Sequence, residues 1–208
     1  KPVNGLLQHL PEANLLKTDF FQFSTDRKFH TILMNPPYVR HHLLNNTKIN
    51  KYRSKHKELN IINNSSDLWA YFLIKAVSHL EVDGSIGAIL PWSFLQADYS
   101  KPLRKLLFDN FGKINVIALK DKFFDEADER IIVLWLKHFG IKNRSIKIAA
   151  ATNTFTKINF TNISLENWSS DRVYYTTNES PNDILKQYKE KYKFANLDEY
   201  ADVKIGVV

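Results

Sequence analysis

The sequence contains no cysteine among its 208 residues. This absence excludes disulfide bonds, thiolate zinc sites and thiol nucleophiles, and it fits a reducing compartment such as the cytoplasm. No apolar run approaches the roughly 18 residues that a membrane-spanning helix needs, and no secretory signal peptide is recognisable at the start. An initial methionine is lacking too, because the chain begins at Lys1. We therefore expect a segment of a longer, non-membrane protein.

Acidic residues are outnumbered by basic ones, 22 Asp and Glu against 29 Lys and Arg, which gives a formal net charge of +7. A basic balance of this size favours an anionic partner, nucleic acid above all, although it also occurs in proteins that simply stay soluble. Hydrophobic residues make up 44% of the chain and aromatic residues 13%. This composition is typical of a globular protein, and 208 residues suffice for one full core or for one domain with part of a second.

The hydrophobic pattern predicts alternating strands and helices. A short strand ends near Asp19, and a long loop with one short helix occupies residues 39–66. The other expected elements are buried strands at 28–34 and 85–91, a turn at 82–84, strands at 113–119 and 130–139, and helices at 66–80 and at 101–111, where Gly112 ends the helix. This alternation indicates an α/β domain with a largely parallel sheet. Because only about ten residues join the last two strands, we expect that pair to be antiparallel, in a mixed sheet whose reversed strand lies near one edge.

The character of the sequence changes after residue 140. Residues 145–165 are β-prone and rich in Asn and Thr, residues 181–192 predict a helix, and residues 200–208 begin a strand. We therefore expect one domain over residues 1–140 and a connecting region over residues 141–208 that leads into a further domain.

The segment Phe29–Arg40 reads FHTILMNPPYVR, an apolar run that breaks into Asn35, Pro36, Pro37 and Tyr38. Proline cannot donate a ladder hydrogen bond, so the strand should end there. The simplest interpretation is a strand-ending turn, because Asn and Pro are both common in turns. The position indicates more, since open α/β sheets place their active sites at the carboxyl ends of parallel strands.

These four residues resemble the Asn-Pro-Pro-Tyr motif of the S-adenosylmethionine-dependent DNA adenine-N6 methyltransferases. The resemblance implies that the Asn35 side chain and the Pro36 carbonyl accept the two N–H bonds of an adenine amine, which localises the nitrogen lone pair for attack. Pro36 and Pro37 would hold the backbone rigid, and Tyr38 would stack on an adenine flipped out of the duplex. Such a site requires no histidine base, metal ion or covalent intermediate.

The resemblance covers about residues 14–139 and is strongest to the γ-type, Eco57I-like restriction–modification enzymes. Besides NPPYVR it rests on SSDLWAYFLIKAVSHLEVDGSIGAILPWSFLQADYSKPLRKLLFDNF and KDKFFDEADERIIVLWL. It implies a Rossmann-like class I methyltransferase sheet, incomplete on its N-terminal, donor-binding side. Residues 1–140 would be the catalytic half with motifs III–VIII, and residues 141–208 would lead into an absent target-recognition domain, which FANLDEYADVKIGVV resembles entering.

The resemblance also implies roles for single residues. Asp19 and Phe20 match the family's third motif, in which the acid accepts from the adenine amine of the methyl donor and the aromatic packs on its ring; a capping Asp beside a core Phe is the alternative. Phe124 stands where the family places an aromatic on the other face of the flipped base. Phe123 competes for this role, and Asp125 replaces the proline that often follows.

The segment after Tyr38 is rich in basic residues, for which a solvated loop is the alternative to DNA binding. We expect contacts with DNA phosphates, and a steep salt dependence, from Arg40, Lys48, Lys51, Arg53, Lys55 and Lys57. His41 and His42 are adjacent and have no carboxylate cluster beside them, so we expect no metal site. Tyr71 and Phe72 should lie in the core, with the donor pocket as the alternative for one of them.

Glycine is scarce, and the six glycines form no glycine-rich turn of the kind that seats the donor. The strand that would end in a ribose-binding acid is missing as well. We therefore expect this chain alone to bind S-adenosylmethionine poorly and not to methylate. It is a fragment, or a second chain supplies the donor half, or catalysis has been lost. The strand Phe29–Met34 would then lie at an exposed edge, and we expect a dimer or a second chain to cover it.

Two other classes of function remain open. One is a methyltransferase acting on RNA or on a release-factor glutamine, because these substrates also present a planar nitrogen. The other is a non-catalytic DNA-binding module that keeps the fold. The basic segment and the entry into a recognition domain favour DNA. We therefore predict the catalytic portion of a DNA adenine-N6 methyltransferase in a restriction–modification enzyme of the prokaryotic cytoplasm, with double-stranded DNA as partner and S-adenosylmethionine as methyl donor.

Overall fold

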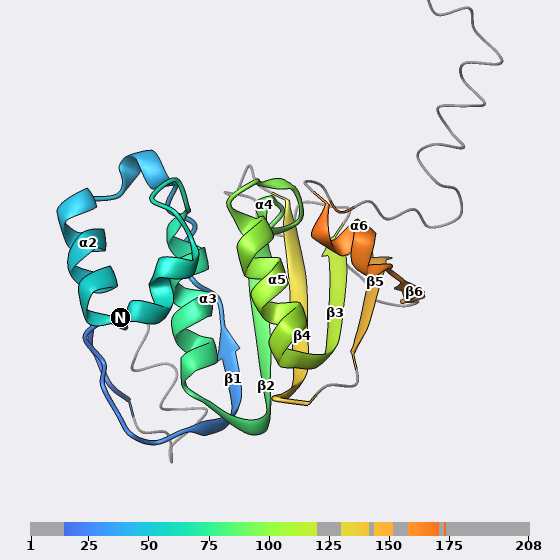
Figure 1. Cartoon of the computed structure of the whole chain (residues 1–208), viewed down its shortest axis with the longest axis horizontal. Helices are drawn as coiled ribbons and strands as arrows, with labels where there is room; N and C mark the ends of the chain where they lie inside the picture. Colours follow the sequence, from blue (N-terminus) through green and yellow to red (C-terminus); the bar gives the residue numbers. More distant parts are fainter. Residues whose placement is uncertain (1–14, 120–129, 142–143, 152–157, 171–172, 174–208) are drawn as a thin grey trace, which may run out of the picture.

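The structure of the protein is a computed structural model, shown in Figure 1. It describes residues 15–119, 130–141, 144–151, 158–170 and residue 173. These residues form one mixed sheet with helices lying over one of its faces.

The strands of the sheet are β1 (Phe29–Met34), β2 (Leu80–Pro91), β3 (Phe111–Leu119), β4 (Ile131–Phe139), β5 (Ser145–Ala151) and β6 (Thr161–Asn162). Their order across the sheet is β1-β2-β4-β3-β5-β6. β1 runs parallel to β2 and β3 runs parallel to β5, whereas β4 is antiparallel to both of its neighbours and β6 to β5. The expected α/β fold with a mixed sheet and an antiparallel β3–β4 pair is confirmed.

The reversed strand β4 lies third in the described sheet, between β2 and β3, and not near an edge as the sequence predicts. The reason is that β5 extends the sheet beyond β3, with seven paired residues from Lys113–Ser145 to Leu119–Ala151. A domain boundary at residue 140 would separate these two hydrogen-bonded strands. The role of residues 141–208 as a connection to a recognition domain stays a proposal.

The helices are α2 (Asn46–Lys55), α3 (Leu68–Ser78), α4 (Ser93–Gln96), α5 (Ser100–Asn110) and α6 (Leu165–Ser169), with two 3-10 helices, η1 (His41–Leu43) and η2 (Lys57–Ile61). The two long helices predicted at 66–80 and 101–111 are confirmed as α3 and α5. Both lie over the same face of the sheet, and α2 stands beside α3 beyond the β1 edge (Figure 1). No helix in the described ranges is long and apolar enough to cross a membrane.

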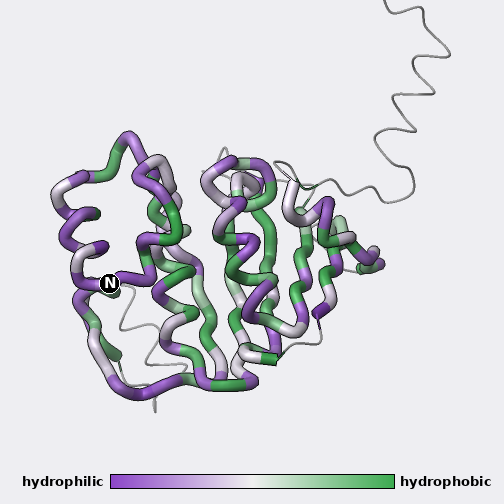
Figure 2. Tube along the Cα trace, viewed as in Figure 1, coloured by the Kyte–Doolittle hydropathy of each residue, from purple (hydrophilic) through white to green (hydrophobic). Residues whose placement is uncertain are grey.

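The main core lies between these helices and the sheet. Alternate residues of the central strands face it, as the two-residue period of a strand requires; they are Ile86, Ala88, Leu90, Ile114, Val116, Ala118, Ile132, Leu134 and Leu136. From the helix side the core receives a row of large aromatic rings, with Phe94 between Trp69 and Trp168 at centroid distances of 6.1 and 5.8 Å. Figure 2 shows the contrast between the apolar central strands and the hydrophilic α2.

The opposite face of the sheet is open in the part of the chain that the structure describes. Leu33 of β1 is 81% exposed and Trp135 of β4 is 47% exposed. Together with Phe160 they line an apolar groove of about 680 Å³. The prediction that β1 is buried is therefore wrong, because β1 forms the edge of the described sheet and has neighbours on one side only.

Residues 15–28 form no strand, although the sequence predicts one that ends near Asp19. Asp19 instead opens a turn, in which the amides of Gln22 and Phe23 donate to its carbonyl oxygen at 2.9 and 3.0 Å. The amide of Phe21 donates to the Asp19 side chain at 3.0 Å. An Asp that captures nearby amides in this way competes with strand pairing for the same donors.

The basic segment 39–66 holds more helix than the sequence predicts. α2 begins where the Asn45 side chain accepts from the Lys48 amide at 3.1 Å, an N-cap that stabilises the first turn. Along its length α2 buries only Ile49 and Tyr52. A helix with so narrow an apolar stripe gives little periodic signal, which explains why the pattern reads as a loop.

β2 begins earlier than predicted, at Leu80, and runs through residues 82–84, where the sequence predicts a turn. The parallel pairing with β1 is irregular there, and Asp83 has a positive φ of 64°. Gly84 is required at this point, because a Cβ atom would lie 2.8 Å from the Glu81 carbonyl oxygen. Gly112 does not end α5 as predicted but belongs to β3, which Phe111 begins in extended conformation.

Candidate active site

Asn35, Pro36, Pro37 and Tyr38 follow the carboxyl end of β1. Pro36 is buried and Tyr38 is half-buried, whereas Asn35 and Pro37 are exposed. The Tyr38 hydroxyl lies 3.5 Å from Asn35 Oδ1, a long hydrogen bond. Two consecutive prolines fix φ at two positions, so the covalent geometry of the turn itself makes it stiff. An exposed amide held on a stiff turn is available to a ligand.

The chain leaving this turn is fixed to α3 by Asp67. Asp67 Oδ1 accepts from the His41 amide at 2.8 Å, and Oδ2 accepts from the Tyr99 hydroxyl at 2.7 Å. The Leu68 amide donates to the Val39 carbonyl at 2.9 Å. Burial raises the pKa of the Tyr99 hydroxyl far above its usual value, and the Asp67 carboxylate raises it further, so Tyr99 remains a donor at neutral pH. The turn therefore enters a rigid junction.

Tyr38 packs over the ends of β3 and β4. Its ring joins a small apolar cluster in which Leu119, the last residue of β3, and Ile131, the first of β4, are buried. The segment that joins these strands thus leaves and re-enters the sheet beside Tyr38. Phe124, with its competitor Phe123, falls in that segment and outside the described residues, so its base-stacking role stays a prediction.

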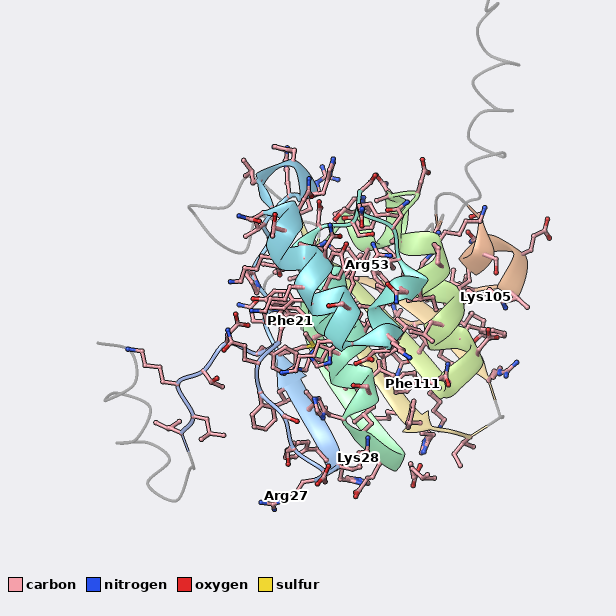
Figure 3. All side chains as sticks on the ribbon, turned by 60° about the vertical axis from the view of Figure 1, so that its left-hand side comes forward. Phe21, Arg27, Lys28, Arg53, Lys105 and Phe111 are labelled. Carbon is pink, nitrogen blue, oxygen red and sulfur yellow. The ribbon has the colours of Figure 1, made fainter. Side chains whose placement is uncertain are left out.

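The turn Asp19–Phe23 lies beside α3 and carries both residues predicted to hold the donor. The Phe20 ring stacks on Phe72 of α3, with centroids 5.2 Å apart and planes 13° apart. The neighbouring Phe21, labelled in Figure 3, is buried and stacks on Tyr52 of α2 with centroids 4.4 Å apart and planes 21° apart. The two rings therefore tie the turn to two different helices.

Asp19 is held by hydrogen bonds from α2. Its Oδ2 accepts from the Tyr52 hydroxyl at 2.5 Å and lies 3.4 Å from Lys48 Nζ. Burial pushes the pKa of the Asp19 carboxyl upward, but the Tyr52 hydroxyl, the Phe21 amide and Lys48 outweigh it and hold that pKa below its usual value. Asp19 is therefore an anion at neutral pH and accepts hydrogen bonds only.

Lys75 of α3 holds the other end of the same turn. Its side chain is buried, and Nζ donates to the Phe20 carbonyl at 2.5 Å and to the Phe23 carbonyl at 2.8 Å. The ammonium group also lies 5.0 Å from the centroid of the Phe20 ring. Burial lowers the pKa of Lys75, with a smaller contribution from Lys55. A buried cation bonded to backbone carbonyls is a strong local brace.

A pocket of about 420 Å³ opens between this turn, α2 and α3. Its size lies in the range of roughly 300–1,000 Å³ usual for small-molecule sites. The residues that line it and matter here are Asp19, Phe20, Phe72, Lys48 and Tyr52. One carboxylate, two stacked rings and a cation suit a flat heteroaromatic ligand that carries an amine.

The basic residues predicted to bind DNA do not form one group. Lys48 faces Asp19, and Arg53 donates to Asn60 and Asn64 near the start of the following loop. The remaining four, Arg40, Lys51, Lys55 and Lys57, have exposed side chains around α2 and its ends. Tyr71 is buried with its hydroxyl donating to the Asn63 carbonyl, as expected of a core residue, whereas Phe72 lines the pocket.

Sequence reasoning missed three features: Tyr52 beside Asp19, the brace by Lys75, and the Asp67–Tyr99 junction. Lys48 and Tyr52 are four residues apart and so share a face of a helix, a signal that is usable only when α2 is recognised as helical. Lys75 lies in an otherwise apolar stretch of a helix that the sequence predicts, and this exception indicates a buried lysine with hydrogen-bond partners. No group of three or more potential metal ligands occurs in the portion of the chain that the structure describes.

Comparison with known proteins shows the family to which this chain belongs. Residues 6–124, more than half of the chain, match the family described as Eco57I restriction-modification methylase. The chain belongs to this family. The predicted Eco57I-like resemblance is thereby confirmed, and the match includes β1, the Asn35–Tyr38 turn and the Asp19–Phe23 turn.

Individual relatives agree with the Eco57I family assignment. The chain is 28% identical over 192 residues to the Type II methyltransferase M.AccI of Acinetobacter calcoaceticus, which covers 89% of this chain and 32% of M.AccI. The Type II methyltransferase M.BstVI of Geobacillus stearothermophilus is 25% identical over 86% of this chain and 32% of its own length. The chain thus spans about a third of these relatives.

Solved structures agree on the fold of this family member. The DrdV–DNA complex superposes with a TM-score of 0.56 at 17% identity, over 79% of this chain and 21% of that one. A protein of Listeria monocytogenes described as a class I S-adenosylmethionine-dependent methyltransferase gives a TM-score of 0.50 at 13% identity, over 62% of this chain and 39% of that one. The described sheet is therefore a class I methyltransferase sheet.

Proposed function

We propose that this chain is the catalytic portion of a restriction–modification DNA methyltransferase that moves a methyl group from S-adenosylmethionine to N6 of a flipped adenine. The observation that carries the proposal is the exposed Asn35 amide on a proline-stiffened turn at the carboxyl end of β1, in a member of the Eco57I family. Similarity to Type II methyltransferases supports DNA as the substrate. Since the chain spans about a third of them, the activity belongs to the complete protein.

The acceptor chemistry follows from the turn. An adenine amine is a poor nucleophile because its lone pair is delocalised into the ring. Asn35 Oδ1 and the Pro36 carbonyl, as two fixed acceptors, favour a tetrahedral nitrogen with a localised lone pair, and they need no reorganisation during the reaction. Tyr38 supplies a ring face on which the extruded base stacks, with Phe124 proposed for the other face. The contact of Tyr38 with Leu119 and Ile131, at the ends of β3 and β4, holds the tyrosine ring in place.

The pocket beside the Asp19–Phe23 turn fits the adenosyl end of the methyl donor. S-adenosylmethionine supplies the reaction with an electrophilic methyl group on sulfur. Asp19, held as an anion, would accept from the adenine amine of the donor, and the stacked pair Phe20–Phe72 would pack on its ring. The part of the donor site built from a glycine-rich turn has no counterpart in the sequence of this chain.

Arg40, Lys51, Lys55 and Lys57 would meet DNA phosphates around the flipped base, in keeping with the net charge of +7. We also propose that a second chain, or a second copy, pairs with β1, which forms an edge of the sheet within the residues that the structure describes, because an edge strand presents unpaired backbone groups. Such an enzyme would act in the prokaryotic cytoplasm, where its DNA substrate lies.

The proposal is tested by transfer of labelled methyl to unmethylated plasmid DNA, RNA and protein by the complete protein, followed by product analysis. We expect N6-methyladenine in DNA, and a loss of rate of about a hundredfold or more in Asn35→Ala, because one preorganised acceptor is removed. Asn110→Ala is the matched control, since the Asn110 amide only donates to the Leu106 carbonyl on α5. Transfer that survives Asn35→Ala, or product only in RNA or protein, would contradict the proposal.

A further inference from the structure

Helix α2 has two chemically different sides. On one side Ile49 and Tyr52 are buried, and Lys48, next to them on the helix, turns to Asp19. Lys51 is exposed and lies at the edge of this side, about 100° around the helix from Tyr52. Lys48 is 60% exposed but pairs with Asp19, whereas Lys51 extends into solvent.

The side of α2 that buries Ile49 and Tyr52, its inner side, makes four contacts with the Asp19–Phe23 turn. Tyr52 donates to Asp19 Oδ2 and stacks on Phe21. Lys48 Nζ approaches the same Oδ2 at 3.4 Å, and His56 Nε2 lies 2.8 Å from the Phe21 carbonyl. Contacts of a phenol, a cation and an imidazole with one short turn are not expected of a segment that is only solvated or that only binds DNA.

We propose that the inner side of α2 belongs to the methyl-donor site, with Tyr52 as the positioning residue of Asp19 and Lys48 as its charge partner, and that Lys48 is not a DNA-binding residue. This inference rests on the proposed function, because it names further residues of the same donor pocket. The inference removes Lys48 from the residues predicted to bind DNA. Lys51, Lys55 and Lys57 remain among them.

The geometry of Asp19 supports the positioning role. Its two oxygens are held separately, Oδ1 by the Phe21 amide and Oδ2 by the Tyr52 hydroxyl. Two bonds to different oxygens fix the plane of the carboxylate. An ionised carboxylate has about four lone-pair sites, so capacity remains for a donor amine in the pocket that Asp19 lines. Without Tyr52, Oδ2 would keep only the looser contact with Lys48 at 3.4 Å, so the plane of the carboxylate would be less firmly fixed.

Lys48 and Tyr52 of α2 contact Asp19 directly, and Lys75 of α3 interacts with it at longer range. His56, which follows α2, bonds to the Phe21 carbonyl and pairs with Glu58 of η2. The Tyr52 hydroxyl is the largest of the influences that lower the pKa of Asp19. Its removal therefore raises that pKa, and a donor site that requires the Asp19 anion loses its ligand at a higher pH. A residue with only a packing role would not move this midpoint.

The test is calorimetric titration of the complete protein with S-adenosylhomocysteine, the unreactive demethylated donor, across acid and neutral pH. We expect Tyr52→Phe to weaken binding about tenfold, as loss of a hydrogen bond to a charged group does, and to raise the pH at which binding is lost. Tyr71→Phe is the matched control: its hydroxyl also donates one hydrogen bond, but to the Asn63 carbonyl, and the residue is buried in the core, so binding and its pH midpoint should stay as in the wild type.

A second pair of variants does not depend on the buried tyrosine. Lys48→Gln should weaken ligand binding severalfold and leave the salt dependence of DNA binding unchanged, whereas Lys51→Gln should do the reverse; both side chains are exposed, so both variants should fold. If the wild type binds the ligand but Tyr52→Phe keeps the wild-type affinity and pH midpoint, or Lys48→Gln behaves as Lys51→Gln, the inference is overturned. If the wild type binds no ligand, the proposed function fails as well.

Discussion

The two turns of the candidate site are rigid for different reasons. The Asn35–Tyr38 turn is stiffened by its own covalent geometry, since two prolines fix its backbone, and the hydrogen bond from the Tyr38 hydroxyl to Asn35 is long at 3.5 Å. The Asp19–Phe23 turn contains no proline and is held by α2 and α3, through Tyr52 and Lys75. A local device thus positions the proposed acceptor site, and a tertiary one positions the proposed donor site.

This difference predicts which substitutions act on which half of the reaction. A change inside the Asn35–Tyr38 turn should alter the rate of methyl transfer and leave donor binding intact. A change in a helix that holds the Asp19–Phe23 turn should weaken donor binding, even when the substituted residue is far away in sequence. Substitution of a buried cation that lies away from both turns, Arg104, should alter stability alone.

The largest effect is expected from Arg104→Met, away from both turns. Arg104 is buried and donates to the carbonyls of Trp168 and Phe94 at 3.1 and 3.0 Å, which joins α6 to α4 and α5. The substitution removes both bonds; Ser100 Oγ still donates to the Phe94 carbonyl, but the Trp168 carbonyl loses its Arg104 donor, so the free energy of unfolding should fall by about 2–3 kcal/mol. Denaturant unfolding measures this loss, with Lys105→Met as the exposed control on the same helix. Donor affinity of the folded variant should be unchanged; a loss would show that the regions are coupled.

A smaller effect, on binding, is expected from Lys75→Met, which tests the tertiary device directly. Methionine fills a similar volume without the charge, so the cost of burying an ammonium group disappears as its two hydrogen bonds are lost, and stability should change little. The released turn carries Asp19 and Phe20, so the dissociation constant of the donor should rise about tenfold, which is about 1.4 kcal/mol. Calorimetry with S-adenosylhomocysteine measures it. Unchanged affinity would mean that the turn keeps its shape without the brace.

The smallest effect is expected from the double variant Pro36→Ala, Pro37→Ala, which relaxes the local device. Each substitution frees φ and should lower stability by about 0.4–1 kcal/mol through the unfolded chain. The maximal rate of methyl transfer should fall severalfold, because Asn35 and the backbone carbonyl are less fixed, while KM for the donor should stay constant. Steady-state kinetics with varied donor separates the two parameters. A rise in donor KM without a fall in rate would reverse the assignment of the two turns.

Much of the fold could be predicted from the pattern of residues. α3 and α5 have regular apolar spacing, and the short link between β3 and β4 indicates their antiparallel pairing. The place of β4 inside the sheet could not be predicted, because it depends on β5 pairing with β3. One short helix was expected within residues 39–66, but the bounds of α2 could not be predicted, because its stabilising contacts are an N-cap and a tyrosine bound to a distant turn, and neither leaves a periodic apolar pattern.

The sequence by itself determined the stiffness of the Asn35–Tyr38 turn, since proline restricts its own backbone wherever it stands and these four residues are consecutive. The sequence of residues 6–124 also sufficed to place the chain in the Eco57I family. Only the tertiary structure decided how the Asp19–Phe23 turn is held. Tyr52 is 33 residues from Asp19, and Lys75 is 55 from Phe20, so their contacts exist only after α2 and α3 have packed. Packing also decided which lysine of α2 pairs with Asp19, because the burial of Ile49 and Tyr52 brings Lys48 beside that carboxylate.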